Sequence, residues 1–163
     1  MRYDLLKVLL VDDNRYARAL LAEILRAVGV REIFEAVDGA DGLAQMQATP
    51  IDVVITDLSM APMDGIDFVR LLRTSPDSPN QFAPVIMVTG QATRARLDAA
   101  RDAGVTEFVA KPFTPRAVLQ RLHLAIEQPR PFVRNEAFVG PDRRRRAEPG
   151  FGPGRRRADR VRP

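Results

Sequence analysis

Hydrophobic residues form short runs along residues 1–128, and these runs alternate with segments of helical periodicity. Each run is apolar at successive positions, which is typical of a strand buried on both faces of a parallel sheet. The segments between the runs repeat apolar residues every three or four positions, as in a helix that packs on one side. The predicted strands are 7–11, 32–36, 52–57, 84–89 and 106–110, and the predicted helices are 15–28, 40–47, 65–73, 92–103 and 115–128.

The regular alternation of these elements predicts the fold class. Five strands that alternate with five helices indicate an α/β fold, with a five-stranded parallel sheet doubly wound by the helices. The segment 129–163 lacks either periodicity and holds 6 of the 13 prolines and 4 of the 10 glycines. We therefore expect one domain over residues 1–128, followed by a largely irregular C-terminal tail that is partly docked or disordered.

Composition excludes several classes of protein. The chain has no cysteine, which excludes a disulfide framework, a thiolate zinc site and a cysteine nucleophile. No apolar run approaches the ~20 residues that a membrane span needs. The first apolar stretch is also too short for a signal peptide and ends at acidic residues. We therefore expect a cytoplasmic protein with no membrane partner.

Charge divides the chain into two unlike parts. Residues 1–128 hold 14 basic and 17 acidic residues, a net charge of −3, whereas residues 129–163 hold 11 and 4, a net charge of +7. An arginine run can bind phosphates, nucleic acid or an acidic surface, or can simply be solvated. The tail has no room for a helix-turn-helix, so we expect no sequence-specific DNA binding. The candidate partner-binding residues are Arg143, Arg144, Arg145 and Arg146.

Polar residues gather where the predicted strands end. The active edge of such a fold lies at the carboxyl ends of its strands. Converging carboxylates repel one another and raise one another's pKa unless a divalent cation lies among them, and oxygen ligands favour Mg²⁺. A lysine and a threonine nearby can bind phosphoryl oxygens, and a carboxylate can itself accept a phosphoryl group. The residues at these strand ends are Asp12, Asp13, Asp57, Thr89 and Lys111.

These residues carry a family resemblance. The segments Val-Asp-Asp-Asn at 11–14 and Lys-Pro-Phe at 111–113, together with Asp57 and Thr89, resemble the signature of bacterial two-component response-regulator receiver domains, the CheY-like family. The resemblance covers about residues 5–127 and places the receiver domain within residues 1–128. It implies a flavodoxin-like fold and a protein of phosphorelay signal transduction.

The resemblance also implies roles for single residues. Asp57 is expected to be the phosphoacceptor, and Lys111 to pair with the phosphoryl oxygens and to hold the Asp57 carboxylate. Asp13 and Asp57 are expected to bind Mg²⁺ (or Mn²⁺) directly, Asp12 mostly through water, and Ser59 through its backbone carbonyl. The peptide bond between Lys111 and its proline is expected to be cis, as is usual in the family.

Two further residues are expected to form the switch. Thr89 would supply the hydroxyl that moves toward the phosphate, and Phe108 would be the aromatic ring whose rotamer reports the switch. Taken alone, Phe108 is also a plain core residue, and Thr89 with the following glycine is also an ordinary turn. His123, the only histidine, is expected to be a half-buried surface residue without chemistry, so the phosphodonor histidine belongs to another protein.

The implied function is a stand-alone response regulator. A partner histidine kinase or histidine phosphotransfer protein would phosphorylate Asp57, and the domain would catalyse no reaction other than its own phosphorylation and dephosphorylation. The phosphorylated form would bind an unknown output protein. A homodimer through the last helices is possible, with Arg101, Glu107 and Arg121 near such an interface, although solvated surface charge is the simpler interpretation.

Departures from the family pattern leave alternatives open. Pro62 stands one place later than the usual proline, Gly90 replaces a common alanine, and Phe108 replaces a common tyrosine. The chain could also be a receiver-like fold that is never phosphorylated, or a regulator that binds nucleic acid or an acidic partner through its arginine-rich tail. A haloacid-dehalogenase-like phosphatase fits less well, because Asp57-Leu58-Ser59 offers no second acid.

Overall fold

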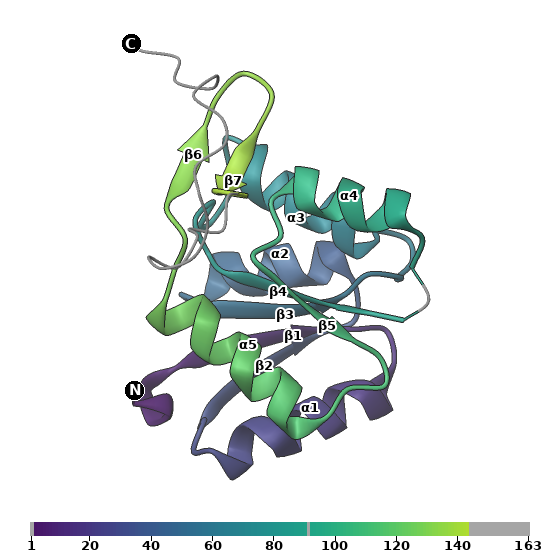
Figure 1. Cartoon of the computed structure of the whole chain (residues 1–163). Helices are drawn as coiled ribbons and strands as arrows, with labels where there is room; N and C mark the ends of the chain where they lie inside the picture. Colours follow the sequence, from purple (N-terminus) through teal and green to yellow (C-terminus); the bar gives the residue numbers. More distant parts are fainter. Residues whose placement is uncertain (1, 91, 144–163) are drawn as a thin grey trace, which may run out of the picture.

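A single parallel sheet forms the centre of the molecule (Figure 1). The computed structural model describes residues 2–90 and 92–143. The sheet has the strand order β2-β1-β3-β4-β5, and every neighbouring pair is parallel. Its strands are β1 (Lys7–Val11), β2 (Glu32–Ala36), β3 (Val53–Asp57), β4 (Val85–Thr89) and β5 (Glu107–Ala110).

Helices cover both faces of this sheet. Helices α1 and α5 pack on one face, whereas α2, α3 and α4 pack on the other, so two separate apolar clusters form (Figure 1). This arrangement confirms the predicted doubly wound α/β fold. The helices are α1 (Arg15–Ala27), α2 (Gly39–Ala48), α3 (Gly65–Thr74), α4 (Arg94–Ala103) and α5 (Pro115–Glu127), and a short 3₁₀ turn (Tyr3–Leu5) precedes β1.

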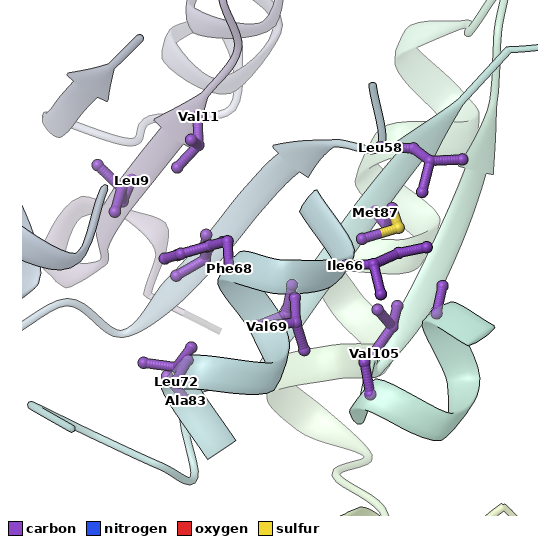
Figure 2. Packing of buried hydrophobic residues seen from close by; sticks show 14 of the residues in the cluster. Leu9, Val11, Leu58, Ile66, Phe68, Val69, Leu72, Ala83, Met87 and Val105 are labelled. Atoms are coloured by element: carbon purple, nitrogen blue, oxygen red, sulfur yellow. The ribbon is translucent and has the colours of Figure 1, made fainter. Parts of the chain in front are cut away.

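The apolar runs that predicted the strands lie at the centre of both cores, and helix side chains pack on them. Every residue of β3 and β4 is buried, as expected for central strands covered on both faces. Figure 2 shows Phe68 and Leu72 of α3 in the same cluster as Leu9 of β1 and Met87 of β4, and Phe68 and Leu72 are fully buried. Leu20 and Leu71 follow the helical spacing but are 48% and 39% exposed, because they lie at the margins of their apolar stripes.

Polar caps begin each helix close to the end of the preceding strand. Each cap side chain accepts a hydrogen bond from a backbone N–H of the first turn, which satisfies a donor that the helix leaves unpaired. α4 ends at Gly104, whose φ of 108° lies in the left-handed region that favours glycine. The capping residues are Asn14, Asp38, Asp64, Thr93 and Thr114.

A hairpin follows the fifth helix, in the segment predicted to be largely irregular. Strands β6 (Phe132–Arg134) and β7 (Val139–Pro141) pair antiparallel and lie beside the ends of α3 and α4 (Figure 1). Phe138 is buried there, so part of the tail docks on the body. No helix in the described part of the chain is long and apolar enough to cross a membrane.

Candidate functional site

Three carboxylates meet at the carboxyl edge of the sheet. Asp12 and Asp13 follow β1, and Asp57 is the last residue of the neighbouring strand β3. Val11 pairs with Thr56 in the register, so the residues that follow lie side by side. One carboxylate oxygen from each acid lies within 4.8 Å of the others. Asp12 and Asp57 are buried, whereas Asp13 is exposed.

The position of Asp12 makes its negative charge costly. Burial raises its pKa above the ordinary value, although the Asn14 N–H, which donates to Oδ1 at 2.9 Å, lowers the pKa. The nearby charge of Asp57 raises it again. A divalent cation would relieve this repulsion, and three carboxylate oxygens are the ligands that Mg²⁺ prefers. The donor set therefore fits the predicted ion.

Lys111 supplies the positive charge of the site. It follows β5, and its Nζ lies 3.0 Å from Oδ1 of Asp57 and 3.9 Å from Oδ2 of Asp12. The backbone N–H of Leu58 donates to the same Asp57 oxygen at 3.0 Å. Both donors therefore hold Asp57 through one of its two oxygens. The peptide bond between Lys111 and Pro112 is cis, which confirms that expectation.

A small pocket opens beside these groups. It has a volume of about 170 Å³ and is lined by Asp57, Lys111 and Ser59, together with Leu58, Gly90 and Ala92. A Cβ at Gly90 would have no atom within 4 Å, so this side of the pocket is open. The structure thus brings Ser59 next to the carboxylates, as the expected carbonyl ligand must be.

Thr89 lies at the carboxyl end of β4, between Asp57 on β3 and Lys111 after β5. Its backbone carbonyl accepts the Lys111 N–H at 2.6 Å. Thr89 and the half-buried Phe108 also line a larger groove of about 740 Å³, in which Leu97 of α4 and Arg121 of α5 take part. Thr89 therefore connects the carboxylate site with a groove between two helices.

Two residues near the site were missed at the level of sequence. The Arg18 Nη1 donates to the backbone carbonyl of Asp12 at 2.6 Å, and its Nε donates to Glu35 at 3.2 Å. Gly65 lies so close to Asp57 that a Cβ there would be 2.2 Å from its carbonyl oxygen. No local sequence pattern marks the contacts of Arg18, and the close approach of Gly65 to Asp57 appears only once the turn after β3 is folded.

The remaining predicted residues lie away from the carboxylates. Arg121 pairs with Glu107 at 3.2 Å, and Arg101 pairs with Asp98 at 3.4 Å, both within the chain. The homodimer through these residues stays a prediction. His123 is exposed rather than half-buried. The Arg143 Nη1 lies 2.8 Å from Asp102 of α4, whereas Arg144, Arg145 and Arg146 lie outside the described residues.

The strand order and the acidic edge define a class of protein. A doubly wound sheet of order 2-1-3-4-5, with carboxylates and a lysine at its carboxyl edge, defines a flavodoxin-like α/β domain with a candidate cation site. The response regulator receiver domain family matches residues 8–123 of the chain. The chain belongs to this family.

Several chemotaxis proteins are similar over nearly their whole length. The probable chemotaxis protein CheY of Rhizobium etli is 38% identical over 122 residues, which cover 75% of this chain and 90% of that protein. The chemotaxis protein CheY of Pseudomonas aeruginosa is 34% identical over 76% of this chain and 98% of that protein. The family match ends at residue 123, before the C-terminal hairpin.

Solved structures give the same result for the fold. The chemotaxis protein CheY4 of Vibrio cholerae superposes with a TM-score of 0.66 at 33% identity, and the match covers 72% of this chain and 96% of that one. A receiver domain of a sensor histidine kinase from Pseudomonas aeruginosa superposes with a TM-score of 0.64 at 26% identity, and covers 74% and 96%. That structure has a magnesium ion coordinated in its active-site cleft.

Proposed function

We propose that this chain acts as a response regulator, which a partner histidine kinase or histidine phosphotransfer protein of the cytoplasm phosphorylates on Asp57. Receiver domains of this kind are not enzymes in the usual sense, because the group that they transfer ends on their own side chain. The phosphorylated form then binds an output protein. The observation that carries the proposal is the Asp57 carboxylate, buried beside two further acids and 3.0 Å from Lys111.

The chemistry at Asp57 follows from its surroundings. Lys111 and the Leu58 N–H hold Oδ1, so the other carboxylate oxygen is the one positioned to attack phosphorus. The new O–P bond forms as the bond from phosphorus to the donor histidine breaks, and the leaving imidazole takes a proton. Such a transfer needs mainly an in-line nucleophile and fixed positive charge. The pocket of about 170 Å³ beside Asp57 is where we place the phosphoryl group.

Mg²⁺ (or Mn²⁺) would be held by Asp13 and Asp57, with Asp12 acting mostly through water and the Ser59 carbonyl as a further ligand. When bound, the ion would neutralise charge on the phosphoryl oxygens. The chain's own part is to hold the carboxylates together and to present Lys111 to the same oxygens. Burial raises the pKa of Asp12 and the nearby charge of Asp57 raises it further, so a cation held by these carboxylates would lower the cost of the Asp12 charge.

The output step would use Thr89 and Phe108. Thr89 lies between the phosphoryl site and the groove of about 740 Å³, and Phe108 lines the same groove. A shift of the Thr89 hydroxyl toward the phosphoryl group would change the wall of this groove. Phosphorylation would thus shift the population between two shapes of one surface, and an output protein would bind one of them better.

Phosphorylation with radiolabelled acetyl phosphate tests the proposal. The native chain should take up label only with Mg²⁺ present, and the label should be lost in acid or base, as is expected for an acyl phosphate. Asp57→Asn should abolish the labelling. Asp77→Asn is the matched control, because Asp77 lies exposed in the loop after α3. Label that persists in Asp57→Asn, or uptake without a divalent cation, would contradict the assignment.

A further inference from the structure

The hairpin after α5 lies outside the region that the family match covers. Its contacts play no part in the chemistry proposed for Asp57. They lie on the last turn of α3, on the end of α4 and on the start of β5. Three kinds of contact attach it there, and all three converge on the segment that joins α4 to β5.

The first contact is a buried arginine. Arg73 of α3 is completely buried, and its guanidinium donates to the backbone carbonyls of Gly104 (3.1 and 3.0 Å), Ala83 (2.7 Å) and Gln81 (2.9 Å). No carboxylate of the described residues pairs with it. Its charge lies instead 4.9 Å from the ring centroid of Phe132, on β6. Burial lowers the pKa of Arg73 to about 9, so the group is still a cation at neutral pH.

The second contact joins two glycines. A Cβ on Gly104, where α4 ends, would lie 2.8 Å from the Val139 carbonyl oxygen. A Cβ on Gly140, in β7, would lie 2.9 Å from the Gly104 Cα and 2.7 Å from the Phe138 ring. The backbone of the hairpin therefore packs directly on the backbone that ends α4, at a distance that no larger residue permits.

The third contact is polar. Arg143 pairs with Asp102 of α4 at 2.8 Å, and its guanidinium lies 4.2 Å from the Phe138 ring centroid. Arg130, just before β6, donates to the Thr106 carbonyl, immediately before β5, and to the Asp142 carbonyl. One hairpin thus binds α4 on one side and β5 on the other.

α4 depends on the contacts with the hairpin more than α3 does. Only Ala100 and Ala103 of α4 are buried, both in its second half, whereas α3 buries six residues. Segments with few buried apolar contacts open at low free-energy cost. The first half of α4 buries no side chain, although Arg96 pairs with Asp64 at 3.3 Å. This half follows directly on the loop after Thr89.

We infer that the C-terminal hairpin is a clamp that fixes the end of α4 against β5, so that the receiver unit of this chain extends to Arg143. The clamp confines movement of α4 to its first half, beside Thr89, and it forms one wall of the groove of about 740 Å³ through Pro141 and Arg143. The clamp itself is independent of Asp57. Only the confinement of the switch movement rests on the proposed function.

Hydrogen exchange of the full chain tests the clamp. Gly140→Val should separate the hairpin from Gly104, and amides of residues 129–143 and 100–105 should then exchange at least about tenfold faster. Amides of β1 and β3 should keep their native rates. Faster exchange in the hairpin with native rates at 100–105 would show that the hairpin holds nothing, and would overturn the inference.

A milder pair of variants covers the case in which Gly140→Val does not fold. Arg143→Gln removes the contact with Asp102, whereas Arg134→Gln makes the same substitution at an exposed position of β6. Exchange at 100–105 should rise severalfold in Arg143→Gln and should stay native in Arg134→Gln. Equal rates in the two variants would count against the clamp.

A second arm uses beryllium fluoride with Mg²⁺ as a phosphoryl mimic. In the native chain the change in exchange should be confined to residues near Asp57 and to 89–99, and in Gly140→Val it should spread to 100–105. A change that already spreads to 100–105 in the native chain would overturn the confinement. If the mimic changes nothing even around Asp57, the proposed function fails, whereas the first arm still decides the clamp.

Discussion

Two regions of this molecule hold buried charge in opposite ways. At the carboxyl edge of the sheet, three acids face one lysine, so negative charge is in excess. At the docking site of the hairpin, the cation of Arg73 has backbone carbonyls and an aromatic ring around it, but no acid from residues 2–90 or 92–143 pairs with it. The first region fits a ligand of opposite charge, whereas the Arg73 guanidinium already has its acceptors within the chain. The excess of negative charge in the pocket thus indicates a binding site. The Arg73 charge, which backbone carbonyls satisfy, indicates a structural role.

The largest loss of stability should come from removing the charge of Arg73. Arg73→Met keeps the length of the side chain but leaves the Gly104 and Ala83 carbonyls without donors. Each unpaired buried group costs about 1–3 kcal/mol, so the free energy of unfolding should fall by roughly 3 kcal/mol or more. Urea denaturation measures it. Arg70→Met, on the exposed side of the same helix, should change it by less than about 0.5 kcal/mol. Equal losses in both would mean that Arg73 is not the anchor.

Two glycines at the acidic edge differ in the space around them, so alanine substitutions there should differ in their cost to stability. Gly65→Ala places a Cβ 2.2 Å from the Asp57 carbonyl oxygen, so the backbone under the site must move. Overpacking of this kind costs about 1–3 kcal/mol. Gly90→Ala meets nothing within 4 Å and should be nearly neutral. Thermal unfolding of both variants checks this, and a loss at Gly90 as large as that at Gly65 would contradict the geometry.

The excess of acid predicts how stability depends on Mg²⁺ and pH. Because burial raises the pKa of Asp12 in the folded chain, the folded state holds that proton more tightly than the unfolded state. The contribution of this group is therefore lost as pH rises from the unfolded to the folded pKa, and the metal-free protein carries the cost at neutral pH. Mg²⁺ at 100 times its Kd should restore about 2.7 kcal/mol.

Asp12→Asn separates the cost of the buried Asp12 charge from the stabilisation that Mg²⁺ gives. It should stabilise the metal-free chain at neutral pH and remove most of the stabilisation that Mg²⁺ gives to the native chain. Denaturation curves with and without Mg²⁺ measure both, and Asp52→Asn, at an exposed acid before β3, is the control. A full response to Mg²⁺ in Asp12→Asn would mean that the Asp12 charge takes no part in holding the ion.

The two regions also differ in how much of them the sequence predicts. Parallel strands bring their carboxyl ends to one edge, so Asp12, Asp57 and Lys111 could be placed together from the strand pattern alone. The hairpin could not be predicted, because its three-residue strands are too short for any periodicity and its prolines suggest irregular chain. Arg73 has the sequence features of a surface residue. Its burial depends on carbonyls and a ring that lie 8–59 residues further along the chain.

The smallest effect concerns Arg18, which lies beside the acidic edge. It makes one hydrogen bond to a backbone carbonyl and one ion pair. It donates to the Asp12 carbonyl at 2.6 Å and pairs with Glu35, which is 52% exposed, at 3.2 Å. An exposed ion pair contributes about 0–1 kcal/mol, so Glu35→Gln should change the free energy of unfolding by less than about 0.5 kcal/mol. Arg18→Gln should cost about 1 kcal/mol, since it also removes the donor to the carbonyl. If Glu35→Gln costs as much as Arg18→Gln, the ion pair and not the backbone contact holds the turn that carries Asp12.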